Sequence, residues 1–271
     1  MPQGESPYFE NAPVVERVLG VQFEPLKGFH SGLMGVFWKT LGDEWSQVSD
    51  APPIQPQFER FEGAPSWDPR IVFKFTNSPA NRLQILNESG NRMIQLQNGR
   101  LHLNWKGEAG DDYPRYEQIN REFITHYEGF QRFLTQSLGG EQIRANQWEV
   151  TYVNHLPKGS VWQTPEDWPA LFRIPSSKSH AGGAVLESFS GAWHYELPNQ
   201  CGRLHVEISR GQRDVPEKSE LLIVNLTARG PVDQETSALS IREGLDLGHQ
   251  TIVNAFVDLT SDRAHEFWRL Q

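Results

Sequence analysis

Residues 14–23 read VVERVLGVQF, a run of alternating apolar side chains that predicts the first strand of the fold. A helix, a block of strands and a long helix over Tyr116–Leu138 follow it. The same order restarts with a strand at Trp148–Asn154 and closes with a long helix over Leu239–Leu259. Two copies of strand–helix–strands–helix predict two sheets, each backed by helices and packed as one pseudo-symmetric body.

The first repeat, residues 14–140, has the clearer pattern. Apolar residues at helical spacing predict its first helix, namely Phe29, Leu33, Phe37 and Leu41. The polar, Pro-rich segment 48–70 predicts a long surface loop. Strands are expected at Ile71–Phe75, Arg82–Glu88, Arg92–Gln97 and Arg100–Trp105. Asn98-Gly99 favours a type I′ hairpin between the last two, because both central residues need positive φ.

The second repeat, residues 141–271, follows the same order less regularly. Pro165–Phe172 supports a short helix, and Arg173–Gly183 reads as a Ser/Gly-rich loop. Strands are expected at Val185–Leu197, Arg203–Arg210 and Glu220–Ala228. With an extended arm over residues 1–13, these elements predict an α+β protein with helices on one face of the sheets. The element order resembles the tandem repeat of the TATA-binding-protein-like fold, and that resemblance implies no function.

Composition narrows the classes of partner. The chain has 271 residues and a formal net charge of -9, and no run of Lys or Arg reaches three. Nucleic-acid binding relies on clustered cations, so this balance argues against it. Cys201 is the only cysteine, which excludes an intramolecular disulfide and a multi-Cys zinc site. With neither a signal-like N-terminus nor a membrane-length apolar run, we expect a cytoplasmic protein.

The most suggestive chemistry lies on one predicted hairpin. His194 and Glu196 share a strand face, as do His205 and Glu207. If Asn199–Gly202 is a four-residue loop, His194 lies opposite Glu207 and Glu196 lies opposite His205. Such cross-strand pairs suit a metal site or a general acid–base pair. The alternative is the polar face of a half-exposed sheet, stabilised by charge pairing.

Five other residues complete the candidates. His102 and Asn104 lie on the polar face of their strand, so the two halves together predict a broad concave surface for a protein partner or polar ligand. His249 falls on the apolar stripe of the last long helix, where a core role is expected. His265 and Trp268 are expected to dock the chain end. The sequence has no G-x-S-x-G, Walker or G-x-G-x-x-G motif in the required context.

Two end segments carry a family resemblance. Both chain ends resemble an uncharacterised, sporadically distributed bacterial protein family. The start is NAPVVERVLGVQF at residues 11–23. The ending is a spaced pattern formed by His249, Ile252, Phe256, Leu259, Thr260, His265 and Trp268. The resemblance implies a prokaryotic cytoplasmic protein, and it brings no activity and no site residues. Patchy distribution is common among defence-associated and toxin-linked genes.

Together these features predict a non-catalytic binding or accessory protein that engages a protein partner. An antitoxin-like or defence-associated role is the form we expect, with the partner encoded by a neighbouring gene. No cofactor and no membrane are expected. One alternative is a metal- or small-ligand-binding protein, or a hydrolase, that uses the His/Glu face or the cleft between halves. A second alternative is nucleic-acid binding through a saddle-shaped sheet.

Overall fold

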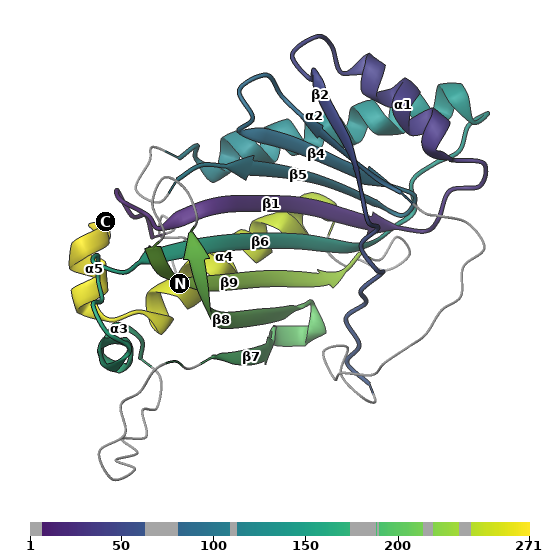
Figure 1. The fold of residues 1–271 in the computed structure, drawn as a ribbon. Helices are drawn as coiled ribbons and strands as arrows, with labels where there is room; N and C mark the ends of the chain where they lie inside the picture. The colour runs from purple at the N-terminus through teal and green to yellow at the C-terminus, as the bar shows by residue number, and fades with distance from the viewer. Residues whose placement is uncertain are drawn as a thin grey trace.

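β1 (Val14–Phe23) and β6 (Ala145–Pro157) lie side by side at the centre of a single antiparallel sheet. The computed structural model describes residues 7–62, 81–108, 113–173, 188, 190–213, 219–232 and 240–271. Nine strands in these ranges pair in the order β2-β3-β4-β5-β1-β6-β9-β8-β7 (Figure 1). The prediction of two sheets was wrong. The first strands of the two halves, β1 and β6, pair with each other, so the two halves form one continuous sheet.

The remaining strands follow the same order outward on each side of this central pair. In the first half they are β5 (Arg100–Lys106), β4 (Arg92–Gln97) and β3 (Arg82–Leu86). In the second half they are β9 (Ser219–Pro231), β8 (Arg203–Arg213) and β7 (Gly191–Glu196). An additional edge strand, β2 (Gln47–Ala51), pairs with β3 in the first half. The α+β class and its two repeats are confirmed.

The long helices cover one face of the sheet. α2 (Tyr116–Ser137) packs on β1 and β5, and α4 (Ile241–Leu259) packs on β6 and β9. α1 (Ser31–Thr40) lies beside α2, where Phe37 meets Phe130 with ring centroids 5.0 Å apart. Among the residues described, none of the helices is both long and apolar enough to cross a membrane.

Close packing of α4 depends on glycine. A Cβ at Gly244 would lie 2.3 Å from Cδ1 of Trp148, and one at Gly248 would lie 2.8 Å from Cγ2 of Val150. The helix backbone therefore rests directly on these two buried side chains of β6. The residue between them, Glu149, points to the opposite face of the sheet.

Short elements complete the second half. They are η1 (Pro165–Asp167), α3 (Trp168–Leu171), η2 (Pro198–Gln200) and α5 (Asp262–Trp268). The N-terminal arm docks on α5, where Phe9 forms a β-bridge with Leu270 and its ring packs edge-on against Trp268. The described part of the arm contains a turn at Glu10 and Asn11, so it is less extended than predicted.

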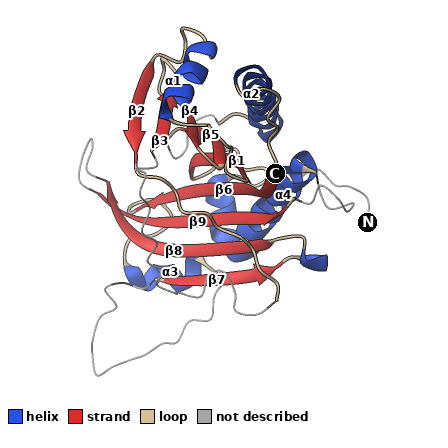
Figure 2. Ribbon diagram, turned by 90° about the vertical axis from the view of Figure 1, so that its right-hand side faces the viewer, coloured by secondary structure: helices blue, strands red, loops and turns tan. Residues whose placement is uncertain are grey.

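The largest difference from the sequence prediction lies after β2. Gln47–Ala51 is an edge strand, and residues 52–62 cross the sheet on the face opposite the helices, where a surface loop was expected. Figures 1 and 2 show this segment running from β2 over the central strands toward β7. We call residues 52–62 the strap. The predicted strand Ile71–Phe75 and most of the predicted loop Arg173–Gly183 lie outside the described residues.

Candidate functional site: a polar sheet face under the strap

Rows of polar side chains run across the strands on the face opposite the helices. The pairing register aligns one row from β4 to β7, namely Gln95, His102, Gly20, Glu149, Arg229, Arg203 and Glu196. A neighbouring row aligns Gln97, Arg100, Gln22 and Gln147. Apolar residues alternate with these positions and face the helices, so the strand period of two separates core from site. The sheet thereby gathers charged and amide groups from both halves.

The strap is bound to this face mainly through its backbone. The Gln97 side-chain amide binds both backbone groups of Ile54. It accepts a hydrogen bond from Ile54 N at 2.9 Å and donates one to Ile54 O at 2.8 Å. Further along, Gln57 N donates to Gln22 Oε1 at 2.9 Å, and Glu59 N donates to Gln147 Oε1 at 3.2 Å. The strap therefore crosses β4, β1 and β6 in that order.

Geometry explains this spacing. Ile54 and Glu59 are separated by five residues, which span about 17 Å when extended. Their partners Gln97 and Gln147 lie on β4 and β6, three strand spacings or about 14 Å apart. A nearly extended chain running across the strands thus meets one glutamine amide after another.

The Glu59 carboxylate is the most completely enclosed group of the site. Its side chain is 0% exposed, and it accepts from Arg203 Nη1 at 2.6 Å and from Arg229 Nε at 2.9 Å. His205 Nε2 lies 2.8 Å from Glu59 Oε1. Burial alone would raise the pKa of Glu59, but the hydrogen bond with His205 and the charges of Arg229 and His205 lower it to about 2. Glu59 is therefore an anion that joins the strap to β8 and β9.

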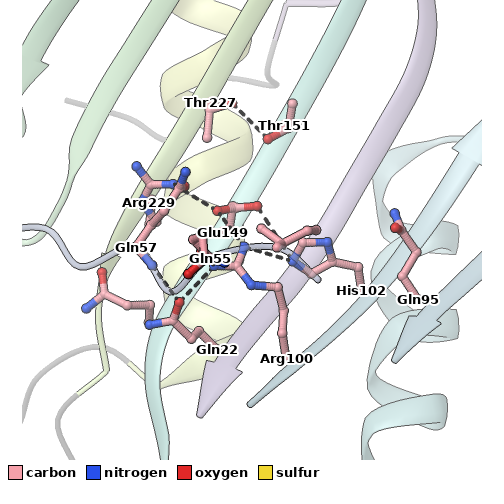
Figure 3. Close-up of polar contacts among 12 residues, drawn as sticks. Gln22, Gln55, Gln57, Gln95, Arg100, His102, Glu149, Thr151, Thr227 and Arg229 are labelled. Carbon is pink, nitrogen blue, oxygen red and sulfur yellow. Dashed lines mark hydrogen bonds and ion pairs between the residues drawn. The ribbon is translucent and has the colours of Figure 1, made fainter. Parts of the chain in front are cut away.

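A second buried carboxylate, Glu149, lies next to the first. Arg229 Nη1 donates to Glu149 Oε2 at 3.0 Å (Figure 3). Because Arg229 Nη2 also lies 2.8 Å from Glu59 Oε1, Arg229 bridges the two carboxylates. Arg100 Nη1 and His102 Nε2 lie 3.5 and 3.6 Å from the same carboxylate. Burial would raise the pKa of Glu149, and the charges of Arg100 and Arg229 lower it overall. Burial lowers the pKa of His102 to about 4, so this imidazole is neutral at pH 7.

The structure corrects the predicted register of the β7–β8 hairpin. His194 pairs with His205, and Glu196 pairs with Arg203, so the expected His194–Glu207 and Glu196–His205 pairs do not form. Leu197 N donates to Gly202 O, so the chain reverses over residues 198–201, one position earlier than the predicted loop Asn199–Gly202. His194 Nδ1 lies 2.8 Å from His205 Nδ1, and Nε2 of His205 meets Glu59. Glu207 is exposed.

Burial divides the predicted site residues into two groups. His102, Asn104 and His205 are 4%, 2% and 8% exposed, so they lie beneath the molecular surface, whereas the Glu196 side chain is 50% exposed. Asn104 donates to Glu16 Oε1 at 2.7 Å and accepts from Gln95 Nε2 at 2.8 Å. The open concave surface predicted from the sequence is thus largely closed.

Three other predicted residues lie away from this face. His249 is on α4, where its Nδ1 lies 2.7 Å from the Tyr152 hydroxyl. His265 Nε2 lies 2.9 Å from the Thr260 hydroxyl, and Trp268 is buried against Phe9 and Phe256. His265 and Trp268 therefore lie at the docked chain end, as expected from the sequence.

The site also contains residues that the sequence reading missed. Glu59, Glu149, Arg100, Arg203 and Arg229 come from four strands and the strap. The alternation of polar and apolar residues along β6 and β9 marks two of these positions, but no short motif joins them. In the described part of the chain, no group of three or more His, Cys, Asp or Glu side chains is arranged to hold a metal ion.

Comparison with protein-family models, with curated proteins and with solved structures gives no match for this chain.

Proposed function

We propose that the protein is a non-catalytic binding protein, and that its polar sheet face takes up an extended segment of a protein partner. The observation that carries this proposal is the strap, which occupies the face as such a segment would. Gln97, Gln22 and Gln147 bind strap backbone groups, and Glu59 supplies the anion for Arg203 and Arg229. In the free protein the strap then fills the binding site itself. A partner segment with a matching carboxylate binds by displacing the strap.

The chemistry of the face favours recognition over catalysis. A general acid or base works best when its pKa lies near the working pH. Glu59 is held as an anion by Arg203 and Arg229, and Glu149 is held as an anion by Arg229. These groups are suited to hold a charge in place, because proton transfer to them would break a buried ion-pair network.

The nucleic-acid alternative receives less support from the same face. A saddle-shaped sheet would need an open cationic surface to meet phosphates. Here the strap lies over the central strands, and Glu59 and Glu149 already neutralise the arginines beneath it. The resemblance of the chain ends to a patchily distributed bacterial family makes the product of a neighbouring gene the first partner to test.

The decisive experiment replaces the strap by a peptide. A labelled peptide PPIQPQFERFE, which copies residues 52–62, is titrated against the wild-type protein and the Glu59→Ala variant, with anisotropy as the readout. Loss of Glu59 weakens the strap and leaves its arginine partners unpaired, so we expect the peptide to bind the variant at least tenfold more tightly than the wild type. The peptide should also raise the Tm of the variant.

Two controls make this result specific. A peptide with Gln at the position of Glu59 should bind the variant more weakly, because it brings no carboxylate to Arg203 and Arg229. Glu62→Ala changes an exposed residue of the same strap and should leave peptide binding at the wild-type level. A folded Glu59→Ala protein that binds neither peptide would overturn the proposal. With a candidate partner in hand, native mass spectrometry should show more complex with Glu59→Ala than with the wild type.

A further inference from the structure

A second candidate site lies on the helix side of the sheet, away from the strap. A cavity of about 900 Å³, partly open to solvent, is bordered by the N-terminal arm, β1, β6 and the facing parts of α2 and α4. Its lining includes Arg17, Tyr113, Tyr116, Tyr152 and His249. Small-molecule sites in proteins have volumes of roughly 300–1,000 Å³ and combine apolar walls with a few placed polar groups. The cavity is therefore large enough for a ligand.

Arg17 is an unusual residue for this position. It is 6% exposed, and its guanidinium carbon lies 4.4 Å from the ring centroid of Tyr113 and 4.7 Å from that of Tyr152. Its Nη1 donates to Pro114 O at 2.8 Å, whereas Nε is buried without a hydrogen-bond partner. No described carboxylate lies within ion-pair distance of it. Buried arginines normally carry a partner for their charge.

The other polar groups of the cavity do not supply that partner. His249 stacks on Tyr116 with ring centroids 4.0 Å apart, and its Nδ1 meets the Tyr152 hydroxyl. Burial lowers the pKa of His249 to about 3 and raises that of Tyr152, so both groups are neutral at pH 7.

Charged residues also reach the cavity wall. Glu10 is 3.4 Å from Arg269 and so already has a cationic partner, and Glu117 is exposed in the first turn of α2. Arg115 is exposed and lies over the Tyr8 ring, with its guanidinium carbon 3.5 Å from the centroid. Arg17 is therefore the buried charge that the described side chains leave unneutralised.

We propose that this cavity binds a small organic carboxylate with an aromatic or apolar body, with Arg17 as the residue that pairs with the carboxylate. A guanidinium binds a carboxylate through its N–H groups, and Arg17, which lines the cavity, uses only Nη1 in a described hydrogen bond. The rings of Tyr113, Tyr152 and Tyr116 supply flat apolar surface for the body of the ligand.

A single carboxylate fits this charge better than a phosphate. Among the described residues of the lining, Arg17 provides the one buried positive charge, because Arg115 is exposed at the cavity wall and the neutral His249 adds none. A phosphate that carries nearly two negative charges would bring a surplus charge into a partly buried space. This inference is independent of the strap-covered face, because the two sites lie on opposite faces of the sheet.

The test compares matched probes by isothermal titration calorimetry. We expect 3-phenylpropionate to bind the wild-type protein, and the uncharged 3-phenylpropanamide and inorganic phosphate to bind at least tenfold more weakly. Arg17→Gln should lower the affinity for 3-phenylpropionate at least tenfold. Arg213→Gln, which changes an arginine outside the cavity lining, should not alter it. Equal binding of acid and amide, stronger binding of phosphate, or no binding of the acid at millimolar concentration would overturn the inference.

A second variant covers the case in which Arg17→Gln fails to fold. Val253 lines the cavity from α4 and is only partly buried, so Val253→Trp fills the space while Arg17 remains. We expect this variant to lose affinity for 3-phenylpropionate at least fivefold. Unchanged affinity in a folded Val253→Trp protein would show that 3-phenylpropionate binds outside this cavity and would contradict the proposal.

Discussion

The imidazole of His102 lies over Gly20, in the space that a side chain on residue 20 would occupy. A Cβ at Gly20 would be 2.3 Å from Cδ2 of His102. Gly20 is the β1 residue aligned between His102 on β5 and Glu149 on β6. The absence of a side chain there lets His102 reach across one strand to within 3.6 Å of Glu149. Glycine at this position is therefore a condition for the polar network to span the two halves.

Gly20→Ala should destabilise the protein because the new methyl group displaces His102. We expect a loss of about 2 kcal/mol in the free energy of unfolding, typical of an overpacked buried site. Urea unfolding measures it. Gly35→Ala is the matched control, because α1 leaves open space around residue 35 and a helical alanine should stabilise by up to about 1 kcal/mol. Adding His102→Ala should recover part of the loss, and a double variant no better than Gly20→Ala would contradict the explanation.

Arg229→Lys should be strongly destabilising although it conserves charge. Arg229 uses Nε and Nη2 for Glu59 and Nη1 for Glu149, and a lysine amine cannot bridge both carboxylates. Leaving one buried carboxylate unpaired costs about 3–5 kcal/mol. The control is Arg210→Lys, which changes an exposed ion pair with Glu220 and should cost less than about 1 kcal/mol. Equal effects of the two substitutions in urea unfolding would refute the bridging role.

Glu59→Gln should reduce stability in a manner that depends on pH. The pKa of Glu59 is about 2 in the folded protein against an ordinary 4.5, so its stabilising effect is complete above pH 4.5 and is lost as pH falls toward 2. We expect a deficit of about 3 kcal/mol at pH 7 for the variant. Urea unfolding at pH 7 and pH 3 should show this deficit shrinking in acid. The exposed Glu62→Gln should show little deficit at either pH, and a deficit that stays constant would argue against a buried Glu59 anion.

His249→Gln should make the protein less sensitive to mild acid. The folded protein lowers the pKa of His249 from 6.5 to about 3, so the unfolded chain takes up its proton first. Stability therefore falls as pH drops below 6.5, by up to about 1.4 kcal/mol per pH unit from this one group. The variant should show a shallower decline between pH 6 and pH 4, because Gln does not titrate. Parallel declines of the two proteins in urea unfolding would show that His249 is not buried in its neutral form.

Much of the fold was predictable because its elements have strong local patterns. The predicted first strand, Val14–Phe23, has the observed bounds of β1, and the expected long helix starts at Tyr116, as α2 does. Their alternating or helical spacing of apolar residues needs no knowledge of distant contacts. The pairing of β1 with β6 was not predictable in this way, because either strand read alone is compatible with an edge or a centre position.

The site was harder to predict because it joins residues that are far apart in sequence. Glu59 and Arg229 are 170 positions apart, and only the completed sheet places them together. The Pro-rich composition of the strap is typical of a surface loop, and no periodicity shows that glutamine side chains satisfy its backbone. The predicted hairpin register was wrong because the loop is displaced by one residue, to 198–201, where Asn199 and Gln200 both adopt positive φ, at 58° and 56°.

The central position of β1 has a consequence for how the chain reaches its native state. β1 pairs with β5 within the first repeat, but its other edge stays unpaired until residues 145–157 arrive to form β6. During synthesis, this side of β1 stays unpaired while the ribosome adds the more than 120 residues that separate β1 from β6. Pairings between such distant segments form slowly, and an apolar open edge invites contact with other chains. This protein is therefore most exposed to aggregation midway through its own translation.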